Sequence, residues 1–548
     1  MGFRKRAKIR SFFRLSGMLT LGYCFLLGLG PTALQAQYNN SQYKLLDIEH
    51  YRLALQVNDS TDQLAAHMEV HLQFKKPLSR FYLDLVAKDT LSGKGMVVDS
   101  VYQNEVRIDF KHLGDKLFIV PKHNFQHLTY TYKIWYRGIP ADGFIIGQNL
   151  HGRRTFFGDN WPNRAKHWFP CIDHPSEKAT VDYLIRVPNH YQVIANGQLK
   201  ETVADSTGYL QYHYKTSVPL PSKVMTVGIA AFAVEELGET AGVPVSTWVY
   251  PETKDAGFYD FAVAPEILSF LSEHLGDYPF EKLANVQSTN RFGGMENAGT
   301  IFYAEKAVTG KRAHKTLIAH EIAHQWFGNS ATETDWAHLW LSEGFATYLA
   351  DLYVLSEEGI GAFRERMGEE RRKVLAFYKE QQTPVVDAMT RDYMKLLNPN
   401  SYQKGAWVLH MLRDILGFDV FWEGLRQYHK KYQFANATTH DFKRVMAAVS
   451  GKNLDTFFDQ WLLKAGHPVL KTRWIYHGLK LRLTIEQQQE HPFEFPLEIQ
   501  LTYTDGSTEI QRIDVPGKNY SYVLETTKDV QDILLDPHTK LLFETTAP

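Results

Sequence analysis

The order of hydrophobic and polar residues divides the chain into three regions. From about residue 37 to residue 242, apolar and polar residues alternate in short runs such as 49–57, 66–74 and 81–85. Alternation with a period of two is typical of half-buried β-strands, and turn-forming residues separate the runs. The first region is therefore predicted to be one large, mainly β domain.

Helical spacing replaces this alternation near residue 256, where apolar residues begin to recur every three or four positions. Helices are predicted at 261–275, 314–328, 341–357, 360–380, 402–416, 419–432, 439–450 and 454–465. Gly466-His467-Pro468 ends the helical region. The runs 479–485, 495–503 and 509–515 then return to the strand pattern, which predicts a small β module of about 80 residues.

The first 36 residues have the order of an export signal. Six basic residues and no acidic ones precede an apolar run from Leu15 to Leu29, and Pro31 and small residues follow up to Ala36. This order predicts a secretory signal peptide over 1–36 and an exported protein, periplasmic or extracellular. An uncleaved membrane anchor is the alternative, although the run is shorter than the roughly 20 residues that a spanning helix needs.

Composition narrows the class of protein. With 44% hydrophobic and 22% charged residues, the chain is neither mainly disordered nor a polytopic membrane protein. Without the signal segment, 54 basic and 61 acidic residues remain, so a net charge of −7 offers no bulk attraction to nucleic acid. The only cysteines are Cys24 and Cys171, which excludes a disulfide framework. We expect no stable membrane insertion after signal cleavage, and the oligomeric state is not predicted.

The main chemical signal is the segment His320-Glu321-Ile322-Ala323-His324, inside a predicted helix. His320 and His324 are four residues apart and share one helix face, so both imidazoles can bind one metal ion. Glu321 lies between them and can face the open side of that metal. Taken alone, the pattern also fits two ordinary helix histidines.

Glu343 is the candidate third ligand. It follows His324 after 18 intervening residues, in another predicted helix, and packing of the two helices would bring its carboxylate to the metal. Two histidines and one glutamate leave the fourth position of zinc open, as in catalytic sites. Imidazole ligands favour zinc over magnesium or calcium, so one Zn²⁺ per chain is predicted.

Five motifs give the chain a family resemblance. They are Gly-Gly-Met-Glu-Asn at 293–297, HEIAHQWFGN at 320–329, EGFATY at 343–348, WFPCIDHP at 168–175 and YQKGAWVL at 402–409. In this order and spacing they resemble the zinc aminopeptidase family of aminopeptidase N and leukotriene hydrolase, a gluzincin family. The resemblance covers most of 37–466 and, more loosely, the terminal β module.

The resemblance implies a multidomain α+β fold. Its parts would be an N-terminal β-sheet domain at 37–242, a thermolysin-like, mainly helical zinc-peptidase domain at 243–466 and a C-terminal β-sandwich at 467–548.

It also implies residue roles. His320, His324 and Glu343 would bind zinc, and Glu321 would be the general base. Tyr402 would donate its hydroxyl to the oxyanion, and Glu296 would bind the free α-amine of the substrate. The substrate-binding segment would also include Gly293, Gly294, Met295 and Asn297.

One segment departs from the family pattern. Many relatives have a glutamine about ten residues before the cysteine of the Pro-Cys-x-Asp motif, where it contributes to the amine pocket. This chain has Asp159-Asn160-Trp161 instead. Asp159 could share the binding of the amine, and the preferred N-terminal residue is not predicted.

These expectations favour a secreted, zinc-dependent aminopeptidase acting on peptides with a free N-terminus. Zinc would activate a water, Glu321 would take its proton and Tyr402 would stabilise the oxyanion. The first alternative is a secreted zinc endopeptidase, which has no use for Glu296. The second is a non-catalytic peptide-binding protein, which needs neither Glu321 nor Tyr402.

Overall fold

A computed structural model describes residues 42–126 and 128–546. The predicted signal peptide at 1–36 and Cys24 lie outside the described residues. Within the described part of the chain, no helix is both long and apolar enough to cross a membrane.

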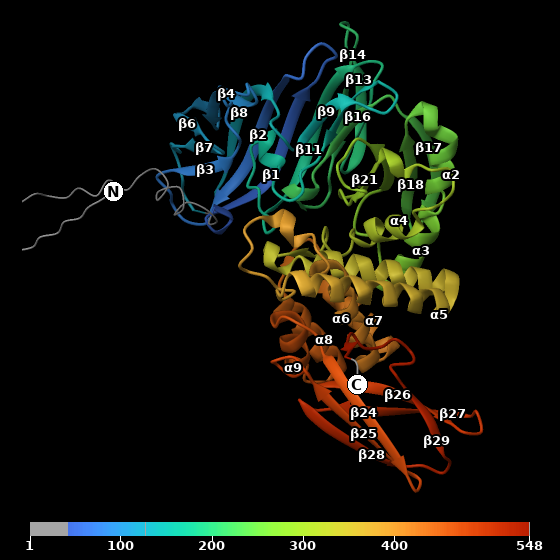
Figure 1. The fold of residues 1–548 in the computed structure, drawn as a ribbon. Helices are drawn as coiled ribbons and strands as arrows, with labels where there is room; N and C mark the ends of the chain where they lie inside the picture. The colour runs from blue at the N-terminus through green and yellow to red at the C-terminus, as the bar shows by residue number, and fades with distance from the viewer. Residues whose placement is uncertain (1–41, 127, 547–548) are drawn as a thin grey trace, which may run out of the picture. The chain divides into compact units, whose positions relative to one another are not determined.

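The predicted β region folds mainly into two sheets (Figure 1). The larger sheet has the order β13-β14-β11-β1-β2-β8-β4-β5, with β15 beside β11, and the second has the order β12-β16-β10-β9. The strands of the larger sheet are β1 (Leu46–Gln56), β2 (Leu64–Phe74), β4 (Gly95–Gln103), β5 (Val106–Arg107), β8 (Thr129–Ile139), β11 (Lys178–Pro188), β13 (Gln198–Ala204), β14 (Tyr209–Lys215) and β15 (Leu220–Pro221). Those of the second are β9 (Phe144–Gln148), β10 (Arg154–Gly158), β12 (Gln192–Ala195) and β16 (Val227–Ala230).

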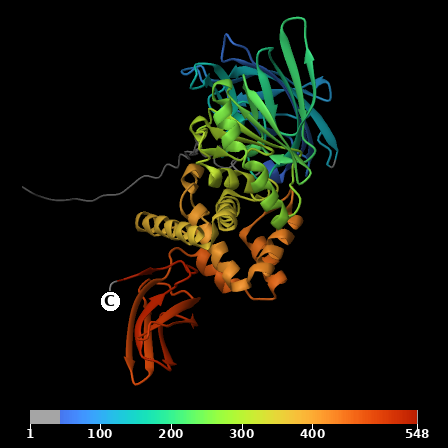
Figure 2. The same cartoon turned by 90° about the vertical axis from the view of Figure 1, so that its right-hand side faces the viewer.

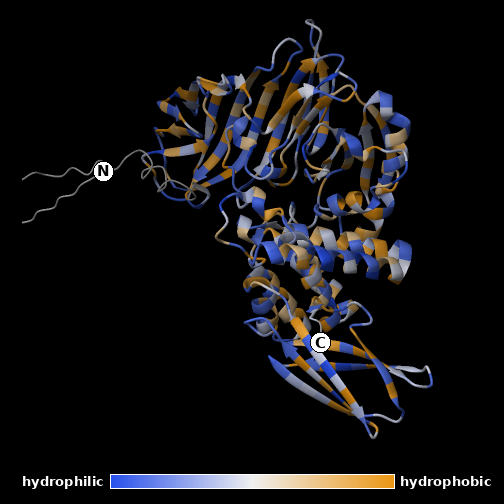
Figure 3. Ribbon diagram, in the orientation of Figure 1, coloured by the Kyte–Doolittle hydropathy of each residue, from blue (hydrophilic) through white to orange (hydrophobic). Residues whose placement is uncertain are grey.

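Alternation explains why these segments form strands. In β2 every second residue is buried, and the hydropathy of the ribbon alternates along the sheet (Figure 3). A small third sheet has the order β3-β7-β6, formed by β3 (Phe81–Asp84), β6 (Phe110–Leu113) and β7 (Lys116–Ile119).

The helical region begins on a five-stranded sheet of order β17-β18-β19-β21-β20. Its strands are β17 (Ala233–Thr240), β18 (Val243–Val249), β19 (Leu283–Ser288), β20 (Gly294–Met295) and β21 (Thr300–Ala304). The predicted domain boundary between residues 242 and 243 lies in the turn of the β17–β18 hairpin. The helices are α2 (Lys254–Phe261), α3 (Ala264–Leu275), α4 (Lys315–Ala323), α5 (Trp340–Glu380), α6 (Gly405–Leu416), α7 (Phe418–Tyr432), α8 (Thr439–Ser450) and α9 (Asp455–Phe458).

Helix α5 has two arms. Gly359 has φ 82° and ψ −178° and interrupts the helical geometry at the point where two separate helices are predicted. A positive φ of this kind favours glycine, because other residues pay a steric penalty there. In the first arm, every residue from Trp340 to Val354 is buried, which fixes the part of α5 that carries Glu343.

The C-terminal module consists of two β-sheets that are antiparallel except for the parallel pair β24–β30, and Figure 2 shows their strands at the C-terminal end of the ribbon. One sheet has the order β28-β25-β24-β30 and the other β27-β26-β29. Their strands are β24 (Val469–His477), β25 (Lys480–Gln487), β26 (Phe495–Tyr503), β27 (Thr508–Val515), β28 (Asn519–Glu525), β29 (Val530–Leu535) and β30 (Glu544–Thr545). Together with the preceding regions, this arrangement confirms the predicted α+β class.

Candidate active site

Helices α4 and α5 bring the three predicted metal ligands together. The Nε2 atoms of His320 and His324 are 3.0 Å apart, and the Oε2 atom of Glu343 lies 3.3 Å from each. Their ligand atoms therefore surround one point, as the helix spacing of the two histidines predicts.

The neighbours of His324 orient its ring. Its Nδ1 atom lies 3.2 Å from the carbonyl oxygen of Phe327, an acceptor that suits Nδ1–H, and a metal bound at Nε2 would replace the proton that the nearby carboxylates favour there. The Ser342 hydroxyl lies 3.2 Å from the same Nδ1. Burial lowers the pKa of His320, which favours the neutral imidazole that metal binding requires.

The chemistry of the three ligands fits zinc. The Oε2 atom of Glu343 is buried and faces the two imidazole nitrogens at 3.3 Å, so a cation bound between the three ligand atoms would neutralise its charge. Two imidazole nitrogens and one carboxylate form a catalytic zinc set with a position left open. Glu296 and Glu321 also have carboxylate oxygens within 4.8 Å of His324, so negative charge is concentrated around this point.

The segment Gly293–Asn297 passes beside this centre. Strand β20 holds Gly294 and Met295 antiparallel to β21. A Cβ at Gly294 would lie 2.2 Å from Oε1 of Glu321, so the bare backbone lets the carboxylate approach closely. Gln325 and Asn329 donate side-chain hydrogen bonds to the carbonyl oxygen of Glu296, at 3.0 and 2.5 Å. Sequence reasoning did not single out these two amides, although both lie in the quoted HEIAHQWFGN block.

Glu296 and Glu321 are two buried carboxylates in one cavity, 6% and 5% exposed. Burial raises the pKa of Glu321 well above its usual value, and burial also raises the pKa of Glu296. A cation bound beside them favours their charged forms. Their protonation is therefore coupled to what binds in the cavity.

Tyr402 approaches from a different element. It lies in a π-helical turn, η8 (Asn400–Lys404), and its ring is parallel to that of His320 with the centroids 6.0 Å apart. Burial, together with the carboxylate of Glu343, raises the pKa of the Tyr402 hydroxyl well above its usual value. The hydroxyl therefore remains a hydrogen-bond donor at neutral pH.

One cavity contains most of the predicted site residues. Its lining consists of Trp161, Phe292, Gly294, Met295, Glu296, His320, Glu321, His324, Glu343, Leu397 and Tyr402. Gly293 and Asn297 flank this lining; Asn297 is fully buried, and its N–H donates to the carbonyl oxygen of Met295.

Phe292 and Leu397 carried no signal in the sequence, and Trp161 was named only as part of the segment that departs from the family pattern. Trp161, Phe292 and Leu397 come from segments far apart in the chain, and only the fold brings them together. Asp159, by contrast, does not line the cavity. It is fully buried and pairs with Arg164, Oδ1 to Nη2 at 2.7 Å.

A β domain followed by a helical domain with a His–His–Glu cluster is the arrangement of a zinc metallopeptidase. Two family models refine this class: the peptidase M1 N-terminal domain matches residues 47–224, and the peptidase family M1 domain matches residues 259–461. The chain belongs to peptidase family M1, and the predicted resemblance is confirmed.

Individual relatives agree with this assignment. The chain is 30% identical over 375 residues to glutamyl aminopeptidase of Bitis rhinoceros, covering 63% of this chain and 38% of that protein. It is 28% identical over 474 residues to glutamyl aminopeptidase of Sus scrofa, covering 81% and 50%. The chain thus spans between about two fifths and one half of these relatives.

A solved structure shares the fold. The E323A mutant of an M1 zinc metallopeptidase from Deinococcus radiodurans superposes with a TM-score of 0.65 at 23% identity. The match covers 76% of this chain and 94% of the other.

Proposed function

We propose that the protein is a zinc-dependent aminopeptidase that removes residues from the free N-termini of peptides. The observation that carries this proposal is the position of Glu296 in the same cavity as the metal ligands, with an oxygen within 4.8 Å of the ligand atom of His324. A buried carboxylate there attracts a terminal ammonium. Internal peptide segments lack that charge and gain nothing from it.

The metal ligands and Glu321 have separate roles in the proposed reaction. His320, His324 and Glu343 would hold zinc, which supplies a Lewis acid that polarises the scissile carbonyl and lowers the pKa of water. Glu321 holds the proton taken from water at its carboxylate and transfers it to the leaving amine.

The other groups bind and orient the substrate. The Tyr402 hydroxyl donates a hydrogen bond to the developing oxyanion, and Glu296 binds the ammonium. The edge of β20 at Gly294 and Met295 lies along the same cavity and offers backbone groups to the peptide.

Hydrolysis of aminoacyl chromogenic amides tests this proposal. Each amide is offered with a free and with an acetylated amine, before and after treatment with a chelator and after zinc is added back. We expect cleavage of the free-amine forms alone, lost with the chelator and restored by zinc.

Other outcomes identify the alternatives. Cleavage of the acetylated forms would indicate a zinc endopeptidase and would leave Glu296 without its proposed role. Absence of cleavage of amides and longer peptides alike, by protein that contains zinc, would favour a non-catalytic peptide-binding protein.

We also propose that the protein is exported to the periplasm or beyond, which rests on the composition of residues 1–36. Cell fractionation followed by N-terminal sequencing tests this. A mature chain that begins at Gln37 in the exported fraction supports cleavage after Ala36. A full-length chain in the membrane fraction would support the anchor instead.

A further inference from the structure

Some of the residues that line the cavity have no role in the proposed reaction. If Glu296 binds the ammonium and the metal centre faces the carbonyl, the Cα of the N-terminal residue lies between them. Its side chain must then point to the remaining walls. Those walls are Trp161, Phe292 and Leu397, since the other lining residues are the metal ligands, Glu321, Tyr402 and the β20 segment. All three side chains are predominantly apolar.

No lysine or arginine lines this cavity. Its other ionisable groups are three carboxylates, two histidines and the Tyr402 phenol. An acidic substrate side chain would therefore lose its hydration without gaining a partner, and Glu296 would repel it. An apolar side chain gains from burial against the same walls.

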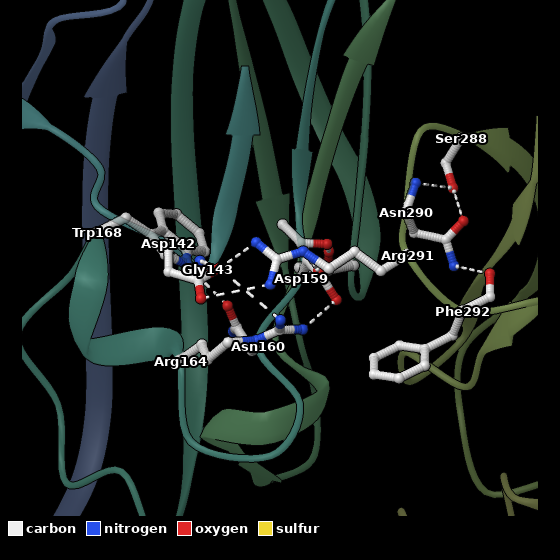
Figure 4. Close-up of polar contacts among 12 residues, drawn as sticks. Asp142, Gly143, Asp159, Asn160, Arg164, Trp168, Ser288, Asn290, Arg291 and Phe292 are labelled. Carbon is white, nitrogen blue, oxygen red and sulfur yellow. Dashed lines mark hydrogen bonds and ion pairs between the residues drawn. The ribbon is translucent and has the colours of Figure 1, made fainter. Parts of the chain in front are cut away.

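Three arginines line the neighbouring cavity, which shares Phe292. Arg391 is one of them, and carboxylates already occupy the other two (Figure 4). Arg164 pairs with the fully buried Asp159, and Arg291 pairs with Asp142 and lies 3.5 Å from Asp159. Neither arginine lines the zinc cavity. Recruiting Arg164 for an acidic substrate would leave the fully buried Asp159 without its nearest partner, which is costly for a buried carboxylate.

The same ion pairs hold the aromatic wall in place. The Arg164 guanidinium lies 5.8 Å from the centroid of the Phe292 ring. Trp161 packs against Phe292 and against Trp336, both nearly perpendicular, with centroids 6.0 and 5.4 Å apart.

Asn160 fixes the backbone just before Trp161. Its Nδ2 atom donates to the carbonyl oxygens of Ser222 and Met225, at 2.8 and 2.6 Å. Its Oδ1 atom accepts a hydrogen bond from Trp168 Nε1 at 2.8 Å. The segment 159–161 therefore contributes Trp161 as a fixed apolar wall of the cavity, whereas Asp159 is held in an ion pair with Arg164.

We propose that Trp161, Phe292 and Leu397 form the pocket for the first side chain of the substrate and select uncharged, apolar N-terminal residues over aspartate and glutamate. This inference rests on the proposed aminopeptidase function. It also separates this chain from the relatives named glutamyl aminopeptidase, because the cavity offers no cation for an acidic side chain.

Comparison of kcat/KM across leucine, methionine, alanine, lysine and glutamate amides tests the proposal. For the wild-type protein we expect leucine or methionine to exceed glutamate by more than about 100-fold. Equal or faster cleavage of the glutamate amide by the zinc-loaded protein would overturn the proposal. If no free-amine substrate is cleaved at all, the aminopeptidase function fails instead, so the two failures are distinguishable.

Variants test the assigned walls. Leu397→Arg places a cation in the cavity and should raise the glutamate-to-leucine ratio of kcat/KM at least about tenfold. Met394→Arg is the matched control, because it adds the same charge three residues away, in a position that does not line this cavity. An equal change of the ratio in both variants, or in neither, would exclude Leu397 from the pocket.

Trp161→Ala enlarges the pocket and should reduce the preference for leucine over tryptophan amides. Its zinc content and circular dichroism spectrum are measured alongside to establish that it folds. An unchanged preference in a folded, zinc-loaded variant would exclude Trp161.

Discussion

At the scale of single residues, Glu321 and Glu296 are two carboxylates of the same cavity with different surroundings. Both are buried in the same cavity, yet Glu321 lies against the bare backbone of Gly294, whereas the backbone carbonyl of Glu296 is fixed by Gln325 and Asn329. These positions fit the proposed roles of Glu321 in proton transfer and of Glu296 in binding the ammonium.

Replacement of Glu321 by glutamine should remove the base without removing the metal. We expect kcat to fall by about 10²- to 10⁴-fold, because that is the usual contribution of a positioned general base. Zinc measured by mass spectrometry should remain at one per chain, since Glu321 is not in the His320–His324–Glu343 set. Full activity would exclude Glu321 as the base, and loss of zinc would show that it is a ligand.

Removal of the Tyr402 hydroxyl should act mainly on the transition state. Tyr402→Phe keeps the ring that is parallel to His320 and deletes only the donor. We expect kcat to fall by about 10²-fold with little change in KM, as for other oxyanion donors. A large rise in KM with kcat unchanged would instead indicate that Tyr402 binds the ground state.

The grouping of the candidate metal ligands was easier to predict from the sequence than the residues around them. His320, His324 and Glu343 could be predicted because helix spacing and ligand type constrain them locally. The grouping of Trp161, Phe292 and Leu397 could not be predicted, because it depends on packing between segments more than a hundred residues apart. For the same reason the sequence left the role of Asp159 open; in the structure Asp159 pairs with Arg164 and does not line the cavity.

At the scale of elements, two glycines set the distance between the helix that carries Glu343 and the turn that carries Tyr402. A Cβ at Gly405 would lie 2.9 Å from the Cα of Gly344, and a Cβ at Gly344 would lie 2.8 Å from the Cα of Gly405. Because the glycine at each side is met by the backbone of the other element, no side chain can move to relieve the contact. The backbones of α5 and α6 are therefore in direct contact at Gly344 and Gly405, next to Glu343 and close to Tyr402 in the sequence.

Gly405→Ala should push these elements apart. We expect kcat to fall at least about tenfold, because small displacements of catalytic groups are costly. Unfolding free energy should fall by about 1–3 kcal/mol from overpacking. Gly361→Ala is the matched control, since nothing lies within 4 Å of its Cβ position in the second arm of α5. Full activity in Gly405→Ala would show that this contact does not position Tyr402.

Element boundaries followed from periodicity where burial is regular. The predicted runs 49–57, 66–74 and 495–503 correspond to β1, β2 and β26 within three residues. The break of α5 at Gly359 was also predicted, between 357 and 360. The π-helical turn at Asn400–Lys404 was predicted only as part of a helix from 402, because apolar spacing does not distinguish the two geometries.

At the scale of the whole molecule, the C-terminal module is attached to the helical region through buried polar contacts. Arg371 of α5 pairs with Asp536 at 2.6 Å and donates to the carbonyl oxygen of Leu541 at 2.7 Å. The Nε2 atom of His410 in α6 lies 2.9 Å from the carbonyl oxygen of Thr539. These contacts connect the module to α5, which carries Glu343, and to α6, which directly follows the turn that carries Tyr402.

His410 should make this attachment sensitive to acid. Burial lowers its pKa to about 4, so the unfolded chain binds a proton more readily than the folded chain. Neutral His410 therefore contributes to the free energy of unfolding. This contribution is complete above about pH 6.5 and is lost as pH falls toward 4, by roughly 3 kcal/mol in total. We expect the melting temperature of His410→Gln to fall less steeply between pH 6.5 and 4 than that of the wild type. The exposed His477→Gln is the control; identical slopes for all three proteins would contradict this account.

The central claim is that Glu296 binds the terminal ammonium of the substrate, and a ratio of cleavage rates tests it most directly. We would measure kcat/KM for a leucine amide and its N-acetyl form, with the zinc-loaded wild type and with Glu296→Gln. The wild type should prefer the free amine by at least about 100-fold, and the variant should lose most of that preference through slower cleavage of the free amine. Equal cleavage of both forms by the wild type, or an unchanged preference in the variant, would contradict the assignment of Glu296 as the residue that binds the terminal ammonium.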